Sequence, residues 1–147
     1  MSYLLQPNGD DYPDAAEKHL RDADLLLQAG RFDGAGYLTG YVVECVLKTY
    51  ILIEKPPITN RDLHHRLNDL SSSALPLAAI SGAKTAKYPL VTTRGHCLYD
   101  SKTGWHETIR YRTTGTVTPQ QANAWFAEAK AIYDSAIPPM KLDGLIN

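Results

Sequence analysis

The sequence predicts an all-α protein: an up-and-down bundle of four main helices with a long, mostly irregular insertion before the last helix. Apolar residues recur at intervals of three and four in four separate segments, which is the spacing of amphipathic helices. Glycine or proline follows most of these segments, where helices end. With 147 residues, the chain suits a single domain, 1–147, with a helical core over about 14–137.

The first two predicted helices are antiparallel neighbours. Asp14 is the expected N-cap of the first helix, with Glu17 as its capping-box partner, and Gly30 ends that helix. Asp33 is the expected N-cap of the second helix, which should run from about 34 to 54. Because so few residues separate the two helices, they should pack side by side in opposite directions.

The second helix should be the central one, because its apolar face is wide. Two glycines at a spacing of four, Gly36 and Gly40, should open one side to a close neighbour. This surplus of apolar and small residues also predicts a homodimer. The expected face consists of Tyr37, Leu38, Tyr41, Val42, Cys45, Val46, Thr49 and Ile53.

A short third helix should follow, capped by Thr59 or Asn60 and ended by the serines at 71–73. Residues 75–80 should add another turn or two. The expected apolar stripe of the third helix consists of Leu63, Leu67 and Leu70.

Residues 81–117 lose the helical periodicity, so we expect one short helix and an exposed loop there. The last helix should begin at Thr118 as N-cap, with Gln121 as capping-box partner, and end at Pro138 and Pro139.

Charge is unevenly distributed, although the formal net charge is -1. Residues 1–60 carry five Lys/Arg against nine Asp/Glu, and residues 61–117 carry eight against four. An anionic partner should therefore bind the middle of the chain.

The apolar run 37–53 is interrupted by Glu44 and Lys48, which makes it too polar for a membrane span. Acidic residues replace a hydrophobic leader near the N-terminus, so we expect a cytoplasmic protein.

Glu44 and Lys48 form a candidate structural pair, four residues apart in an apolar helix. They either occupy the one polar strip of that helix, or form a buried or interfacial pair against the third helix or a second subunit.

His65 is a separate candidate with two interpretations. Its imidazole either forms a hydrogen bond with the backbone at a helix start, or serves as a catalytic or phosphate-contacting group.

A basic and aromatic segment is the main candidate for contact with nucleic acid or nucleotide. Its cations can neutralise phosphates and its aromatic rings can stack bases. Alternatively, Trp105 and Tyr111 anchor the loop to the bundle while the cations stay solvated. The spacing of His96, Cys97 and His106 matches no standard zinc pattern, so neither a metal nor another cofactor is expected. The candidate contacts are Arg94, Lys102, Trp105, Arg110, Tyr111 and Arg112, with His106 beside them.

Four segments form one pattern: the opening helix with Ala15, Leu20, Ala23 and Leu27 that leads to 30–35, the helix segment 40–48, His65-x-Leu67-x-x-Leu70, and Arg110-Tyr111 followed by the last helix from Pro119. In their order and spacing, these segments resemble the HEPN domain, the helical module named for higher eukaryotes and prokaryotes nucleotide-binding. The resemblance implies a homodimeric all-α bundle that associates with RNA or nucleotides. It also implies a setting beside a nucleotidyltransferase partner in toxin–antitoxin or defence systems.

Many HEPN proteins are metal-independent ribonucleases whose signature is an Arg, four to six residues, and then a His. Here Arg61 precedes His65 by only four positions, and His106 precedes Arg110 in the reverse order. The expected function is therefore a non-catalytic binding module. The alternatives are a ribonuclease toxin using His65 or His106 with Arg110, and a structural or regulatory module without a nucleotide ligand.

Overall fold

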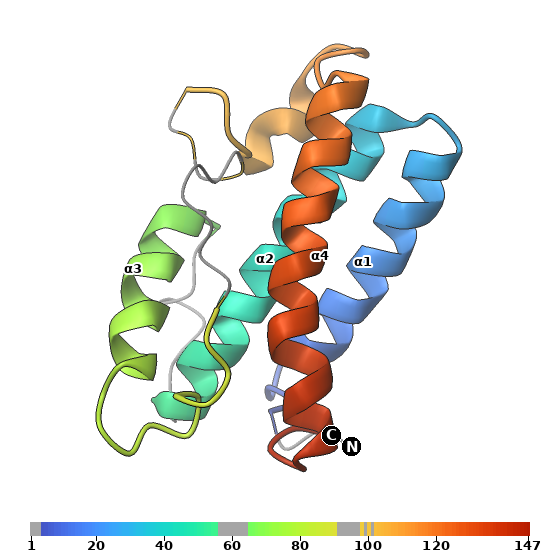
Figure 1. Cartoon of the computed structure of the whole chain (residues 1–147). Coiled ribbons are helices and arrows are strands. Elements are labelled where there is room, and N and C mark those ends of the chain that lie inside the picture. Colours follow the sequence, from blue (N-terminus) through green and yellow to red (C-terminus); the bar gives the residue numbers. More distant parts are fainter. Residues whose placement is uncertain (1–3, 56–64, 91–97, 99, 101) are drawn as a thin grey trace.

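The computed structural model describes residues 4–55, 65–90, 98, 100 and 102–147, and the regular elements among these residues are helices, with no strand (Figure 1). The four-helix bundle is therefore confirmed. A short 3-10 helix, η3, lies within the segment before the last helix. The elements are α1 (Tyr12–Gln28), α2 (Phe32–Glu54), α3 (Leu67–Ala78), η3 (Glu107–Tyr111) and α4 (Pro119–Leu142).

The helices alternate in direction only at the first connection. The antiparallel pair of α1 and α2 is confirmed, but α2, α3 and α4 all run the same way (Figure 1). The start of α4 lies beside the start of α2, where the Asp33 carboxylate accepts the Val117 N–H at 2.8 Å. An up-and-down bundle is thus wrong beyond α2, because the connections 55–66 and 79–118 are long enough to bring the chain back to the same end.

The core is built around α2, which packs against α1, α3, α4 and η3. Its second half, from Val42 to Ile53, is buried throughout. By length and composition α2 qualifies as a candidate membrane span, but 83% of its most apolar window is buried inside the bundle, as in the core helix of a soluble protein.

Gly36 and Gly40 of α2 pack against side chains from elsewhere in the same chain. A Cβ built on Gly36 would lie 2.9 Å from Val117, and one built on Gly40 would lie 1.9 Å from the Trp105 ring. The close approach predicted for this side is therefore intramolecular. It removes the surplus apolar surface from which we predicted a homodimer, and the dimer stays a prediction without that support.

Two helix starts differ from the prediction. The N-cap of α1 is Asp11, whose carboxylate accepts the Asp14 N–H, so the helix begins two residues before Asp14. The N-cap position of α2 is Arg31, and Asp33 lies inside the helix. The prediction of Gly30 as the stop of α1 is confirmed: it has a φ of 69°, a left-handed conformation that glycine adopts without strain.

The end of α3 also differs from the prediction. The serines at 71–73 lie inside α3, which continues to Ala78 with Leu67 and Leu70 buried. The caps expected at Thr59 and Asn60 lie outside the described residues. The helix α4 begins at the predicted N-cap, with Thr118 accepting the Gln121 N–H at 3.1 Å. The expected capping box is wrong, because the Gln121 side chain donates to the Thr103 carbonyl oxygen instead.

Pro138 and Pro139 do not end α4, which runs on to Leu142. Ile137 and Met140 are fully buried on either side of the prolines, and Ile146 after the helix is 1% exposed. The burial of these side chains offsets the backbone hydrogen bonds that the prolines remove.

Asp33 ties the turn before α4 to the start of α2. Its carboxylate accepts the backbone N–H groups of Gly115 at 2.7 Å and Val117 at 2.8 Å, and these bonds lower its pKa. We expect Asp33→Asn to lower the free energy of unfolding by about 1–2 kcal/mol at pH 7. Because the folded pKa is depressed, the contribution exists above the unfolded pKa of about 3.9 and disappears as the pH falls through the folded value.

Denaturant unfolding of wild type and Asp33→Asn at pH 7 and pH 3 checks this expectation. The difference between the two proteins should shrink at the lower pH. An equal difference at both pH values would show that the charge on Asp33 has no part in holding the turn.

Candidate functional site

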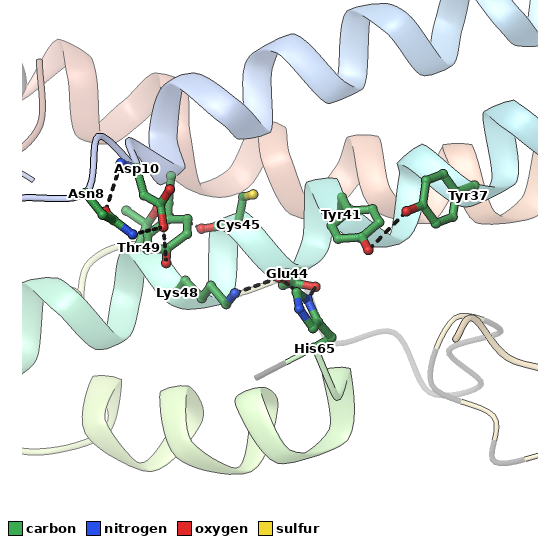
Figure 2. Close-up of polar contacts among 10 residues, drawn as sticks. Asn8, Asp10, Tyr37, Tyr41, Glu44, Cys45, Lys48, Thr49 and His65 are labelled. Atoms are coloured by element: carbon green, nitrogen blue, oxygen red, sulfur yellow. Dashed lines mark hydrogen bonds and ion pairs between the residues drawn. The ribbon is translucent and has the colours of Figure 1, made fainter. Parts of the chain in front are cut away.

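Glu44 and Lys48 form a buried ion pair in the middle of α2 (Figure 2). The Lys48 Nζ lies 2.6 Å from Glu44 Oε1, and the two residues are 4% and 3% exposed. The His65 Nδ1 lies 3.0 Å from both carboxylate oxygens. The pair does not lie on a solvated strip, because both residues are buried and Glu44 contacts His65, two residues before the start of α3.

Tyr41, one turn before Glu44, is the centre of an aromatic cluster. Its ring centroid lies 5.2 Å from that of Trp105, 5.1 Å from Tyr37 and 6.0 Å from His65. On the side of α1, His19 lies 5.7 Å away, and burial lowers its pKa. His65 therefore rests against a ring on one side and a carboxylate on the other.

Trp105 and Tyr111 have different roles. Trp105 is 6% exposed, and its Nε1–H donates to the Tyr37 carbonyl oxygen at 3.0 Å. The anchoring alternative is thus correct for Trp105, which docks on Gly40. Tyr111 is 75% exposed and carries the Arg110 guanidinium 4.8 Å from its ring centroid, so it does not anchor the loop.

Arg110 reaches the same aromatic cluster from η3. Its Nη1 donates to the Tyr37 hydroxyl at 3.3 Å, and that hydroxyl donates to the Tyr41 hydroxyl at 3.2 Å. The hydrogen bonds to Tyr37 and Tyr111 raise the pKa of Arg110. His65 and Arg110 are thus neighbours of one tyrosine pair, with His65 against the Tyr41 ring and Arg110 on the Tyr37 hydroxyl.

A pocket of about 730 Å³ opens between the start of α3, the segment around 98–112 and the start of α4. Trp105 and Trp125 contribute to its wall. Its charged side chains come from segments far apart in the sequence. The cations are Arg66, Lys102 and Arg112, the imidazoles are His65 and His106, and the carboxylates are Asp69 and Asp100.

The two carboxylates of the pocket are partly occupied by local bonds. Asp100 accepts the backbone N–H groups of Lys102 at 2.9 Å and Thr103 at 2.7 Å, which lowers its pKa. Asp69 lies 3.8 Å from the Arg66 guanidinium. Lys102 and Arg112 form no ion pair within the part of the chain that the structure describes, and both line the pocket.

His106 also has a structural role. Its Nδ1 accepts the Thr108 N–H at 3.3 Å and caps η3, while its side chain remains 56% exposed at the pocket. The carboxylate of Glu107 lies 3.3 Å from the same nitrogen.

Five predicted residues therefore meet at one pocket: His65, Lys102, Trp105, His106 and Arg112. Arg110 and Tyr111 lie outside its lining, and Arg94, His96 and Cys97 lie outside the described residues. The sequence reasoning missed Arg66 and Asp69, although Arg66 directly follows His65. Over the described ranges no three His, Cys, Asp or Glu side chains gather as metal ligands.

Comparison of the chain with protein-family models, with curated proteins and with solved structures gives no match.

Proposed function

We propose that the chain is a HEPN-like helical module that binds a phosphate-bearing ligand, RNA or a nucleotide, in the pocket beside α3. The observation that supports this proposal is the convergence of Arg66, Lys102 and Arg112 with two imidazoles around one cavity. Guanidinium and ammonium groups are the usual partners of phosphate oxygens. The cavity volume of about 730 Å³ also falls in the range of about 300–1,000 Å³ typical of small-molecule sites.

Trp105 and Tyr111 are expected to have different roles in ligand binding. The burial of Trp105 against Gly40 favours a role as pocket wall, so its indole is not available for stacking on both faces. Tyr111 is exposed and next to Arg112, and it remains the candidate for stacking a base of a strand that leaves the pocket.

A second candidate function, a metal-independent ribonuclease, is favoured by the contact between Glu44 and His65. A carboxylate that orients an imidazole is a common arrangement for proton transfer. His65 would take the proton of an RNA 2′-hydroxyl, and the 2′ oxygen would attack the adjacent phosphorus. The bond to the 5′ oxygen would break, and that oxygen would leave with a proton. Arg66 or Arg110 would stabilise the charge on the phosphate.

A nucleotidyltransferase partner and a homodimer are proposals that follow from the HEPN resemblance, and a cytoplasmic location is a proposal supported by the burial of α2 inside the bundle. An oligomeric state above monomer by light scattering at micromolar concentration would support the dimer, and a monomer mass would contradict it.

A gel experiment tests the binding proposal. Labelled single-stranded RNA is incubated in EDTA, at two salt concentrations, with wild type, Arg112→Ala and the control Lys130→Ala. Lys130 pairs with Asp134 on α4 and does not line the pocket. We expect a salt-sensitive shift that weakens in Arg112→Ala, with the logarithmic salt slope reduced by about one, and no change in the control.

Cleavage in EDTA that disappears in His65→Ala would make the ribonuclease the correct function. The absence of both shift and cleavage would contradict the proposal, and so would equal weakening by Arg112→Ala and Lys130→Ala.

A further inference from the structure

The structure assigns Glu44 a positioning role: we infer that it holds the neutral imidazole of His65 in the Nδ1–H form and so directs Nε2 toward the pocket. The evidence is the contact itself, in which His65 Nδ1 lies 3.0 Å from each carboxylate oxygen of Glu44. His65 is also a lining residue of the pocket, and its side chain is 52% exposed. One nitrogen of the ring is therefore tied to the core while the ring itself faces the ligand site.

The carboxylate of Glu44 is an acceptor in this arrangement. Lys48 Nζ lies 2.6 Å from Oε1 and supplies a positive charge in a buried environment, which stabilises the ionised carboxylate. An ionised carboxylate offers no hydrogen to donate. The hydrogen between Glu44 and His65 must therefore sit on Nδ1 of His65.

The cluster has neighbours on several sides. Lys48 lies 5.1 Å from the centroid of the Tyr12 ring, which comes from α1. The Tyr41 ring meets the His65 ring edge to face, with centroids 6.0 Å apart and an interplanar angle of 73°. Buried charges keep fixed partners because each unpaired charge costs several kcal/mol. Rotation of the His65 ring would remove one of those partners.

The consequence for the pocket rests on the proposed function. In the Nδ1–H form, Nε2 carries a lone pair at neutral charge and an N–H when protonated. It can therefore accept a hydrogen bond from a ligand hydroxyl in the first state and donate one to a phosphate oxygen in the second. Without Glu44 the imidazole would exchange between its two neutral forms, and Nε2 would lose this defined role.

Nitrogen-15 NMR of the histidine side chains tests the assignment without any ligand. At a pH where the imidazoles are neutral, His65 should carry its hydrogen on Nδ1. His106 is a control within the same spectrum, because its Nδ1 contacts Thr108 and Glu107 and not Glu44. In Glu44→Gln, the preference of His65 should be lost while that of His106 is kept. A wild-type His65 with its hydrogen on Nε2 would overturn the inference, whatever the variant does.

A double-mutant cycle tests the functional consequence, with labelled single-stranded RNA as the probe. We expect Glu44→Gln and His65→Ala each to weaken binding about tenfold, the scale of one hydrogen bond to a charged partner. If Glu44 acts through His65, the double variant should bind no more weakly than His65→Ala alone. Additive losses would contradict a positioning role. Absence of RNA binding in wild type would refute the proposed function, while the NMR result would still decide the form of His65.

Discussion

Glu44→Ala is expected to lower the free energy of unfolding by about 3–5 kcal/mol, because it leaves the ammonium of Lys48 buried without a carboxylate. Lys48 is 4% exposed, and its only described ion-pair partner is Glu44. The loss is a large fraction of the total stability of a single domain, about 5–15 kcal/mol. Urea denaturation followed by circular dichroism measures it directly.

The double variant Glu44→Leu/Lys48→Met is the matched control. It removes both charges and keeps a similar side-chain volume, so its stability should return close to that of wild type or exceed it. The same variant should lose the contact to His65 and hence the effect of Glu44 on the pocket. A cost below about 1 kcal/mol for Glu44→Ala, the value of an exposed pair, would show that the pair is solvated.

Gly40→Ala is expected to destabilise the protein by about 2 kcal/mol and to displace Trp105. The added Cβ would lie 1.9–2.2 Å from Cε2, Cδ2 and Nε1 of the indole, which no side-chain adjustment of alanine can relieve. Helix propensity favours alanine over glycine by about 1 kcal/mol. The steric cost should exceed this gain, because Trp105 can move only by breaking its bond to the Tyr37 carbonyl.

Gly34→Ala is the control on the same helix. Its Cβ would lie 3.1 Å from Cδ1 of Leu26, the end of a flexible side chain, so the substitution should be neutral or stabilising. Tryptophan fluorescence should change in Gly40→Ala and not in Gly34→Ala, and RNA binding should weaken only in the former. Equal stability of the two variants would contradict the docking of Trp105 on α2.

The existence of the helices could be predicted from the sequence because it depends on local patterns. Gly30 and Thr118 stand at helix ends where their backbone and side-chain chemistry acts within a few residues. The stop expected at Pro138 was wrong because a distant effect, the burial of Ile137 and Met140 in the core, outweighs the local one.

The direction of the helices could not be predicted in the same way. Periodicity reports which face of a helix is buried and does not report to which end a long connection returns. Asp33 shows the difference: its carboxylate was expected at its own helix start, and it binds the turn before α4 instead.

The candidate site could be predicted in part. The basic composition of the middle segment pointed to Lys102, His106 and Arg112, and the structure places all three around one pocket. The contribution of Arg66 depends on the packing of α3 against α2. The contact between Glu44 and His65 likewise joins residues 21 positions apart, a pairing that no local spacing indicates.

Chemical-shift mapping by NMR tests the central proposal most directly, that this pocket binds a phosphate-bearing ligand. A short single-stranded RNA is titrated into nitrogen-15-labelled protein, and into a variant with Arg66, Lys102 and Arg112 all replaced by alanine. The proposal predicts that shifts concentrate at 65–69 and 102–112 in wild type and largely vanish in the variant. Shifts confined to other surfaces, or unchanged binding by the variant, would contradict it.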